Sequence, residues 1–196
     1  MTGRILRYMS VFLLLALAAW GCHPYELHGM TEARGPATDL TFPDQDGQPF
    51  TLSNQKGKAV LMFFGYTNCP LECPTTLGSF RRVQEELEVD RDRVSFVMVT
   101  VDPERDTLEV LRRYMAQFDE SFVALRGEGE ALERVKQAYG AVGEKQHAQD
   151  GHGAPLVFHT TDIYLVGRTG DLETVFPYDT APDIIAEDVR HLLGRR

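Results

Sequence analysis

Two uninterrupted apolar runs constrain this chain more than any other feature. Residues 59–66 read AVLMFFGY, and Val94 to Val101 forms a second run of the same kind. A strand that is apolar on both sides must be covered on both faces, as the strands of a parallel sheet are. We therefore expect both runs to be central strands of an α/β fold.

Helical periodicity and turn residues place the other elements around these strands. Apolar residues at steps of three or four predict a helix from Pro74 to Leu87, and we expect further helices over residues 106–118, 129–139 and from 180 onward. Asp106, three residues before Glu109, resembles the start of a capping box. Asp-Gly and Gly-rich turns predict a hairpin over residues 40–52 and another over residues 162–176. This order of elements predicts a mixed central sheet flanked by helices, with an N-terminal β-hairpin.

The N-terminus carries a targeting signal. Arg4 and Arg7 precede an apolar run from Val11 to Trp20, which is about half of the ~20 residues that a membrane span needs. We assign residues 1–22 to a signal peptide or membrane anchor, 23–37 to a tether and 38–196 to one domain. Cys22 follows Gly21 as in a lipoprotein precursor and is the predicted lipidation site, although Trp20 stands where a small residue is usual. Simple cleavage or an uncleaved anchor remains the alternative.

Charge and cysteine content narrow the function further. The net charge is −9, which disfavours nucleic-acid binding. Three cysteines are too few for a disulfide scaffold. The signal segment places the domain outside the cytoplasm, on the outer face of the cytoplasmic membrane, where free thiols are normally oxidised. A working pair of thiols there must be protected, reduced again or bound to a metal.

The loop after the first apolar run holds the candidate chemistry. It reads FFGYTNCPLECP, and right-handed crossovers place it at the carboxyl edge of a central strand, where ligands usually bind. Cys69 and Cys73 lie there between two prolines. They could be structural cysteines, a redox disulfide pair or metal ligands. The i, i+4 spacing suits a metal site and allows a disulfide only with local rearrangement. Thiolates select soft ions, above all Cu(I).

A third ligand would have to come from elsewhere in the chain. Among the histidines, His159 differs because it lies between an apolar triplet, Leu156–Phe158, and the predicted strand that follows. A lone histidine beside a strand is more often structural than a ligand. The residues by themselves therefore leave its role open.

Four motifs in order resemble the Sco/SenC family of copper chaperones, which have a thioredoxin-like fold. They are DQDGQPFTL, FFGYTNCPLECPTTL, VTVDPERDT and HTTDIYLV, and they span Leu40 to about Phe176. The resemblance implies that Cys69, Cys73 and His159 bind copper, as Cu(I), Cu(II) or both. It implies delivery to the CuA-bearing subunit of cytochrome c oxidase. Other periplasmic copper or thiol-redox proteins are further expected partners.

Two positions depart from the family pattern. The family usually has an aspartate two residues after the first cysteine, where this chain has Leu71, and another before the histidine, where it has Phe158. We expect Glu72 to replace the first charge only in part, because it should point elsewhere. Groups that surround the metal ligands tune the metal affinity and the reduction potential, but they do not supply the bonds to the metal.

The sequence thus favours a membrane-tethered copper chaperone that is not an enzyme. The alternative is a thiol–disulfide oxidoreductase that uses Cys69 and Cys73 to keep the CuA cysteines reduced. A third class, a peroxidase of the peroxiredoxin type, normally has a threonine three residues before its nucleophile. Tyr66 occupies that place here, so the sequence disfavours this class.

We interpret residues 102–106, DPERD, as a structural loop in which Asp106 caps a helix and Arg105 pairs with an acid. Phe64 and Tyr66 are expected in the core or at its rim.

Overall fold

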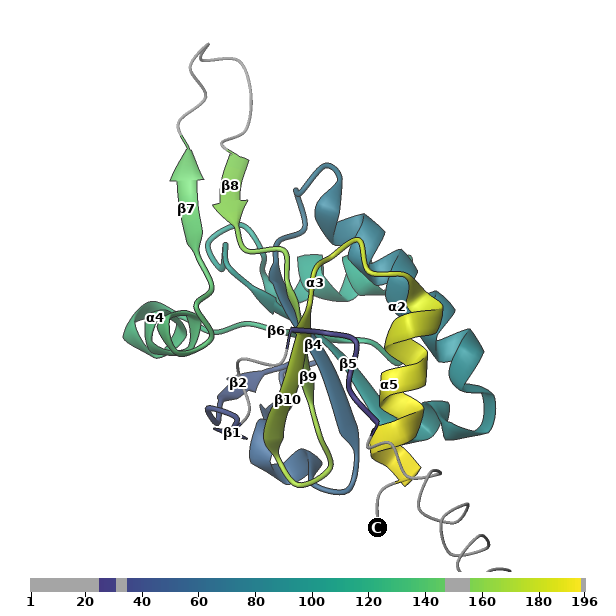
Figure 1. Ribbon diagram of the computed structural model, residues 1–196. Helices are drawn as coiled ribbons and strands as arrows, with labels where there is room; N and C mark the ends of the chain where they lie inside the picture. Colours follow the sequence, from purple (N-terminus) through teal and green to yellow (C-terminus); the bar gives the residue numbers. More distant parts are fainter. Residues whose placement is uncertain (1–24, 31–34, 147–155, 195–196) are drawn as a thin grey trace, which may run out of the picture.

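The computed structural model describes residues 25–30, 35–146 and 156–194 of the chain (Figure 1). The predicted signal segment and its lipidation site, Cys22, lie outside these residues. Of the helices in the described ranges, none has the length and apolar character needed to cross a membrane.

A six-stranded mixed sheet forms the centre of the molecule. Its spatial order is β1 (Gly35–Pro36), β10 (Asp171–Phe176), β9 (Ile163–Val166), β4 (Ala59–Gly65), β5 (Val94–Thr100) and β6 (Val123–Leu125). The last three strands are mutually parallel, and the other pairings are antiparallel. Every residue of β4 is buried, and β5 is buried at all but one position. The prediction from the two apolar runs is therefore confirmed.

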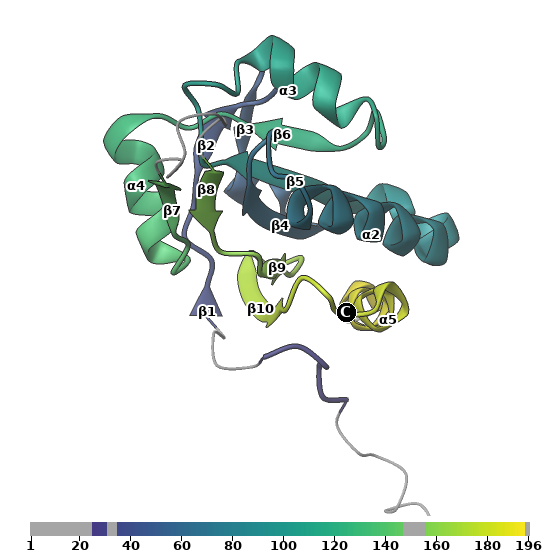
Figure 2. The same ribbon diagram turned by 90° about the horizontal axis from the view of Figure 1, so that it is seen from above.

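Helices cover both faces of this sheet. The long helix α2 (Glu72–Leu87) packs beside α5 (Pro182–Gly194) on one side, and α4 (Gly129–Ala138) lies on the other (Figure 2). The short helix α3 (Leu108–Met115) leads into β6. Two short 3₁₀ segments, Leu52–Gln55 and Glu88–Arg93, complete the helical elements in the described ranges. A cluster of aromatic rings joins α2 to the sheet: Phe63, Phe80, Phe96 and Phe122.

The predicted N-terminal hairpin is present. It consists of β2 (Thr41–Pro43) and β3 (Pro49–Thr51), which pair in antiparallel fashion. The turn between them needs a left-handed residue, and Gly47 provides it with a φ of 78°. The mixed sheet, its helical cover and this hairpin confirm the predicted architecture.

The predicted capping role of Asp106 is wrong. Helix α3 is capped by the next residue, Thr107, whose side chain accepts a hydrogen bond from the Val110 amide at 3.3 Å. Asp106 is instead fully buried and accepts hydrogen bonds from the hydroxyls of Thr67 and Thr100, each at 2.5 Å. Two nearby hydroxyls outside the helix thus bind this carboxylate, which the capping pattern could not reveal.

The predicted hairpin over residues 162–176 is present as β9 and β10, but a third hairpin was not expected from the sequence. Strand β7 (Gly143–Gln146) pairs with β8 (Leu156–His159) and projects from the main sheet (Figure 1). The β7 sequence, GEKQ, is polar and shows no apolar alternation, so it carries no strand signal. The hairpin matters for function because its register places His159 opposite Gly143, next to the body of the domain.

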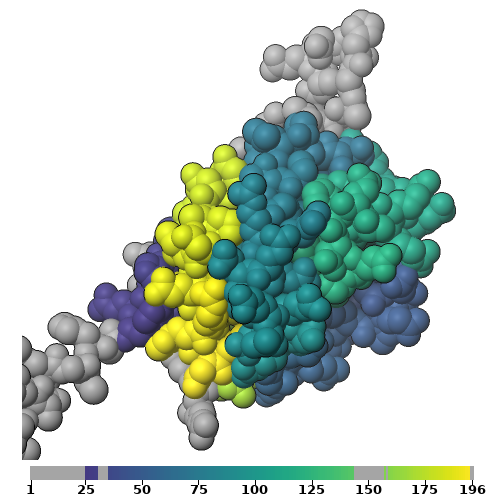
Figure 3. Space-filling view, turned by 90° about the vertical axis from the view of Figure 1, so that its right-hand side faces the viewer, coloured from purple at the N-terminus to yellow at the C-terminus, as the bar shows by residue number. Residues whose placement is uncertain are grey.

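Part of the expected tether is attached to the domain. Residues 25–30, hereafter the N-terminal clasp, lie against α5 (Figure 3) and also contact β10. Leu27 is buried, and Met30 forms an antiparallel bridge with Val175. The low apolar content of this stretch predicts a linker that makes no contact with the domain. The structure differs because the contacts of the clasp are largely polar, and apolar content does not reveal contacts of that kind.

Candidate metal centre

Both cysteines lie where β4 gives way to α2. The chain leaves β4 through a turn in which the Cys69 amide donates to the Tyr66 carbonyl at 3.2 Å, and Cys73 stands in the first turn of α2. Both side chains are buried, with exposures of 6% for Cys69 and 0% for Cys73. Gly65 makes this approach possible, since a Cβ atom there would lie 2.7 Å from the Cys73 sulfur. The structure thus holds two free thiols at the carboxyl edge of the sheet, as predicted.

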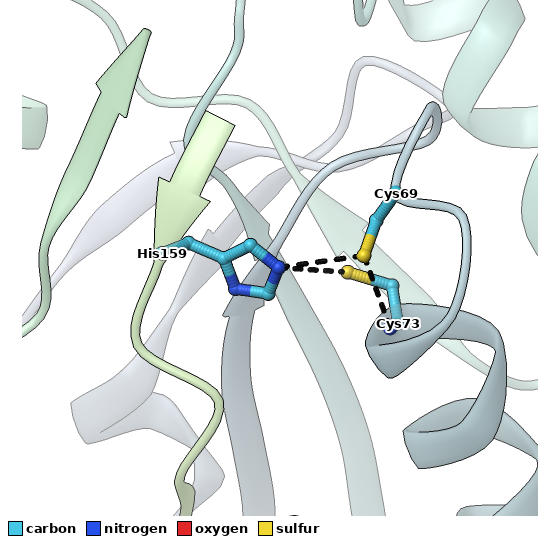
Figure 4. A group of neighbouring side chains, drawn as sticks. All are labelled: Cys69, Cys73 and His159. Atoms are coloured by element: carbon cyan, nitrogen blue, oxygen red, sulfur yellow. Dashed lines mark hydrogen bonds between the residues drawn. The ribbon is translucent and has the colours of Figure 1, made fainter. Parts of the chain in front are cut away.

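His159 completes the group from the end of β8. Its Nε2 atom lies 3.4 Å from the sulfur of Cys69 and 3.7 Å from that of Cys73 (Figure 4). The Nδ1 atom lies 3.0 Å from the Thr160 carbonyl oxygen, to which it donates in the tautomer that leaves Nε2 as a lone-pair donor. The three ligand atoms lie within 4.8 Å of one another, the one such group among the described residues.

Tyr66 positions the histidine, a role that the sequence did not reveal. Its ring meets the His159 ring edge to face, with centroids 5.4 Å apart. Its hydroxyl accepts a hydrogen bond from the Val157 amide at 3.2 Å, which ties β8 to the end of β4. The expectation that Tyr66 and Phe64 are core residues is confirmed, since both are at most 2% exposed.

The two thiols differ in acidity because they share one hydrogen bond. That bond, together with the His159 ring and backbone amides, holds the pKa of Cys69 well below its usual range. The same bond, together with burial, raises the pKa of Cys73. The first proton to leave the pair is therefore that of Cys69. Burial by itself would lower the pKa of His159, but its bonds to Cys69 and the Thr160 carbonyl outweigh burial and raise it.

Glu72 faces the site, and the expectation that it points elsewhere is wrong. One carboxylate oxygen lies 3.2 Å from the sulfur of Cys69. Leu71, at the position where the family usually has aspartate, is 60% exposed. The turn before α2 therefore directs position 72 toward the sulfur and position 71 toward solvent.

The DPERD loop contacts the residues that surround the site. Asp102 forms an ion pair with Arg105, which confirms the expected pairing. The Arg105 guanidinium lies 5.8 Å from the centroid of the Tyr66 ring. Asp106 also accepts the Thr67 amide at 3.1 Å, so the loop after β5 is bonded to the loop that carries the cysteines. The structural interpretation of this motif thus accounts for its contacts.

Of the other histidines, the two that the structure describes lie away from this group. His28 and His191 lie at the N-terminal clasp and α5, where each contacts Tyr25. His23, His147 and His152 fall outside the described residues. Two sulfurs and one imidazole nitrogen form a soft donor set, which favours Cu(I) over hard ions such as Mg²⁺ or Ca²⁺.

Comparison with known proteins agrees with this geometry. Residues 30–194 match the SCO1/SenC family. The chain belongs to that family. A mitochondrial SCO2 homolog from Mus musculus is 32% identical over 157 residues, which cover 78% of this chain and 60% of the mouse protein. The family resemblance expected from the four motifs is confirmed.

Solved structures of the family share the fold. Apo Sco1 from Thermus thermophilus matches with a TM-score of 0.74 at 35% identity, over 87% of this chain and 99% of that one. Copper-bound ScoI from Bradyrhizobium japonicum matches with a TM-score of 0.73 at 32% identity, over 81% and 99% of the two chains. The thioredoxin-like fold class is therefore confirmed.

Proposed function

We propose that this protein binds copper through Cys69, Cys73 and His159 and delivers it to the CuA-bearing subunit of cytochrome c oxidase. The observation that carries the proposal is the convergence of the His159 Nε2 atom on both sulfurs, at 3.4 and 3.7 Å. A sulfur and a nitrogen bound to one ion at ~2.3 and ~2.0 Å would lie roughly 3–4 Å apart at ordinary coordination angles. The copper-bound relative from Bradyrhizobium japonicum supports the choice of metal.

Delivery of copper needs ligand exchange rather than covalent chemistry on a substrate. Cys69 loses its proton first, so it is the ligand that forms and exchanges most readily. Cys73 is fully buried and anchors the ion from within α2. His159 approaches from the separate β7–β8 hairpin, so its bond can break without disturbing the cysteine turn. The acceptor would then take the ion through its own thiolate and imidazole ligands, and no enzymatic step is required.

A second function, thiol–disulfide exchange, is favoured by the unequal acidity of the thiols. The Cys69 thiolate would attack a disulfide of the oxidase subunit, which releases one partner thiolate and leaves a mixed disulfide. The Cys73 thiolate would then attack Cys69, form the Cys69–Cys73 disulfide and release the second partner thiol. An external thiol reductant would restore the pair. This cycle uses no histidine.

His159 separates the two functions. We expect His159→Ala to bind Cu(I) more weakly, to shift or lose the sulfur-to-copper absorption of the Cu(II) form, and to lower maturation of the CuA oxidase. Thiol–disulfide exchange should remain nearly intact. The comparison is His159→Ala beside Cys69→Ala in one maturation assay. Normal maturation by the histidine variant, together with failure of the cysteine variant, would replace copper delivery with the reductase function.

We also propose that Cys22 is lipidated and holds the domain on the outer face of the cytoplasmic membrane. The sequence of residues 1–22 supports this proposal. Cys22→Ser should release the domain from membranes or leave an unprocessed precursor. Unchanged processing and membrane association in this variant would exclude lipidation as the anchor.

A further inference from the structure

Glu72 makes a contact that is unusual for a surface carboxylate. Its Oε2 atom lies 3.2 Å from the Cys69 sulfur, in the half-buried first residue of α2. While Cys69 is protonated, its thiol donates a hydrogen bond to this carboxylate, and no other side chain in the described part of the chain does so. No basic side chain there forms an ion pair with it, although many other acids of the protein have such partners. The carboxylate is therefore directed at a metal-binding sulfur rather than at a cation.

The distance suits two ligands of one ion. An oxygen at ~2.0 Å and a sulfur at ~2.3 Å from a common centre lie roughly 3.0–3.5 Å apart at angles between a right angle and a tetrahedral one. The observed 3.2 Å falls within this span. Glu72 nevertheless stays outside the group of three ligand atoms that all lie within 4.8 Å of one another. Entry into the coordination shell thus requires a side-chain rotation, which an outer residue at a helix start permits.

The two oxidation states of copper would use this oxygen differently. Cu(I) is soft and is satisfied by two thiolates and an imidazole, whereas Cu(II) takes tetragonal sites with nitrogen and oxygen ligands. A carboxylate also adds negative charge, which stabilises the more positive ion. We infer that Glu72 selects for oxidation state: its carboxylate binds the Cu(II) form of this centre and stands aside from the Cu(I) form. This inference rests on the proposed copper-binding function.

The test compares affinities for the two ions in the full domain under anaerobic conditions. Glu72→Gln keeps the size of the side chain and removes its charge. We expect it to weaken Cu(II) binding about tenfold and to change Cu(I) binding less than about twofold. Because a tenfold difference corresponds to ~59 mV for one electron, the copper reduction potential should rise by about that amount. Electron paramagnetic resonance of the Cu(II) form should report the loss of an oxygen ligand.

Leu71 provides the matched control. Leu71→Gln changes the exposed neighbouring residue and should leave both affinities unchanged. Leu71→Asp placed in the Glu72→Gln background should not restore Cu(II) binding, because position 71 faces solvent. Circular dichroism of each variant checks that it folds.

The outcomes distinguish two failures. If the wild-type domain binds neither copper ion, the proposed function and this inference fail together. If the wild type binds both ions and Glu72→Gln weakens them equally or leaves Cu(II) unchanged, only the inference about Glu72 is overturned. Rescue by Leu71→Asp would also overturn it, since the effect would then be one of local charge without a defined oxygen position.

Discussion

Two histidines at different sites of this domain contact partners of different chemistry: soft sulfur atoms for His159 and a hard carboxylate for His28. His159 directs Nε2 at two sulfurs, at 3.4 and 3.7 Å. His28, in the N-terminal clasp, directs Nδ1 at a carboxylate oxygen of Asp188 at 2.8 Å. Both partners raise the pKa of the ring, through the bond to Asp188 for His28 and through the bonds to Cys69 and Thr160 for His159.

The two sites differ in what remains available for a ligand. Asp188 is fully buried in α5, and the clasp supplies it with three donors: the Tyr25 hydroxyl at 2.7 Å, the His28 amide at 2.8 Å and the His28 ring. The Tyr25 ring also stacks on His191, with centroids 3.9 Å apart. At the clasp site, donors of the clasp therefore already occupy the carboxylate of Asp188 and attach the clasp to α5. The sulfurs near His159 are soft donors that share one nitrogen, and this arrangement is open to a soft ion.

The largest expected effect tests the metal side of this comparison. Cys73→Ser replaces the buried sulfur with a hard oxygen that Cu(I) disfavours. We expect Cu(I) affinity to fall roughly 100-fold or more, which is a larger loss than substitution of a residue that only contacts a metal ligand would cause. Competition titration with a Cu(I) chelator measures it. The clasp should be unaffected, so a parallel loss of the Tyr25–Asp188 contact by NMR would contradict the independence of the two sites.

The next effect tests the clasp. Asp188→Ala removes the acceptor of three hydrogen bonds and should lower the free energy of unfolding by about 2–3 kcal/mol. Urea denaturation checks this value. Cu(I) affinity of the folded variant should stay within about twofold of wild type, because the metal ligands belong to other elements. A large loss of copper binding would mean that α5 and the metal site are coupled.

Tyr66 gives a smaller effect that sharpens the geometry of the metal site. Tyr66→Phe leaves the Val157 amide without its acceptor and should cost about 1–2 kcal/mol of stability. Because β8 then loses its tie to β4, Cu(I) affinity should fall up to about tenfold. Tyr164→Phe is the control, since the Tyr164 hydroxyl donates to the Tyr139 carbonyl and makes no contact with His159 in the described structure. Equal effects of the two variants on copper would refute the positioning role of Tyr66.

The smallest effect is a pH dependence of the clasp. The pKa of His28 is raised chiefly by the bond to Asp188, with the charges of Asp188 and Glu187 adding to it. A raised pKa means that the folded state binds the proton more tightly. The stabilisation is therefore complete below the ordinary histidine pKa of ~6.5 and is lost as pH rises through the folded value. Thermal unfolding between about pH 5 and 8 should show this decline, and His28→Gln should flatten it; an unchanged profile in His28→Gln would assign the dependence to another group.

The sequence by itself determined the frame of this protein. The apolar runs of β4 and β5 specified buried parallel strands, because burial on both faces leaves no polar position in such a run. The crossover rule then placed Cys69 and Cys73 at the carboxyl edge of the sheet. These are local patterns, and the structure reproduces them with each strand ending one residue before the predicted run does.

Only the tertiary structure decided which distant groups meet. His159 reaches the cysteines because the β7–β8 hairpin forms and its register pairs His159 with Gly143, yet β7 has no apolar alternation to announce it. Glu72 faces the sulfur because of the backbone turn before α2, and Asp188 is satisfied by donors 160 and 163 residues earlier in the chain. Such contacts depend on how separate elements pack, and periodicity within one element does not encode the partner that lies across the fold.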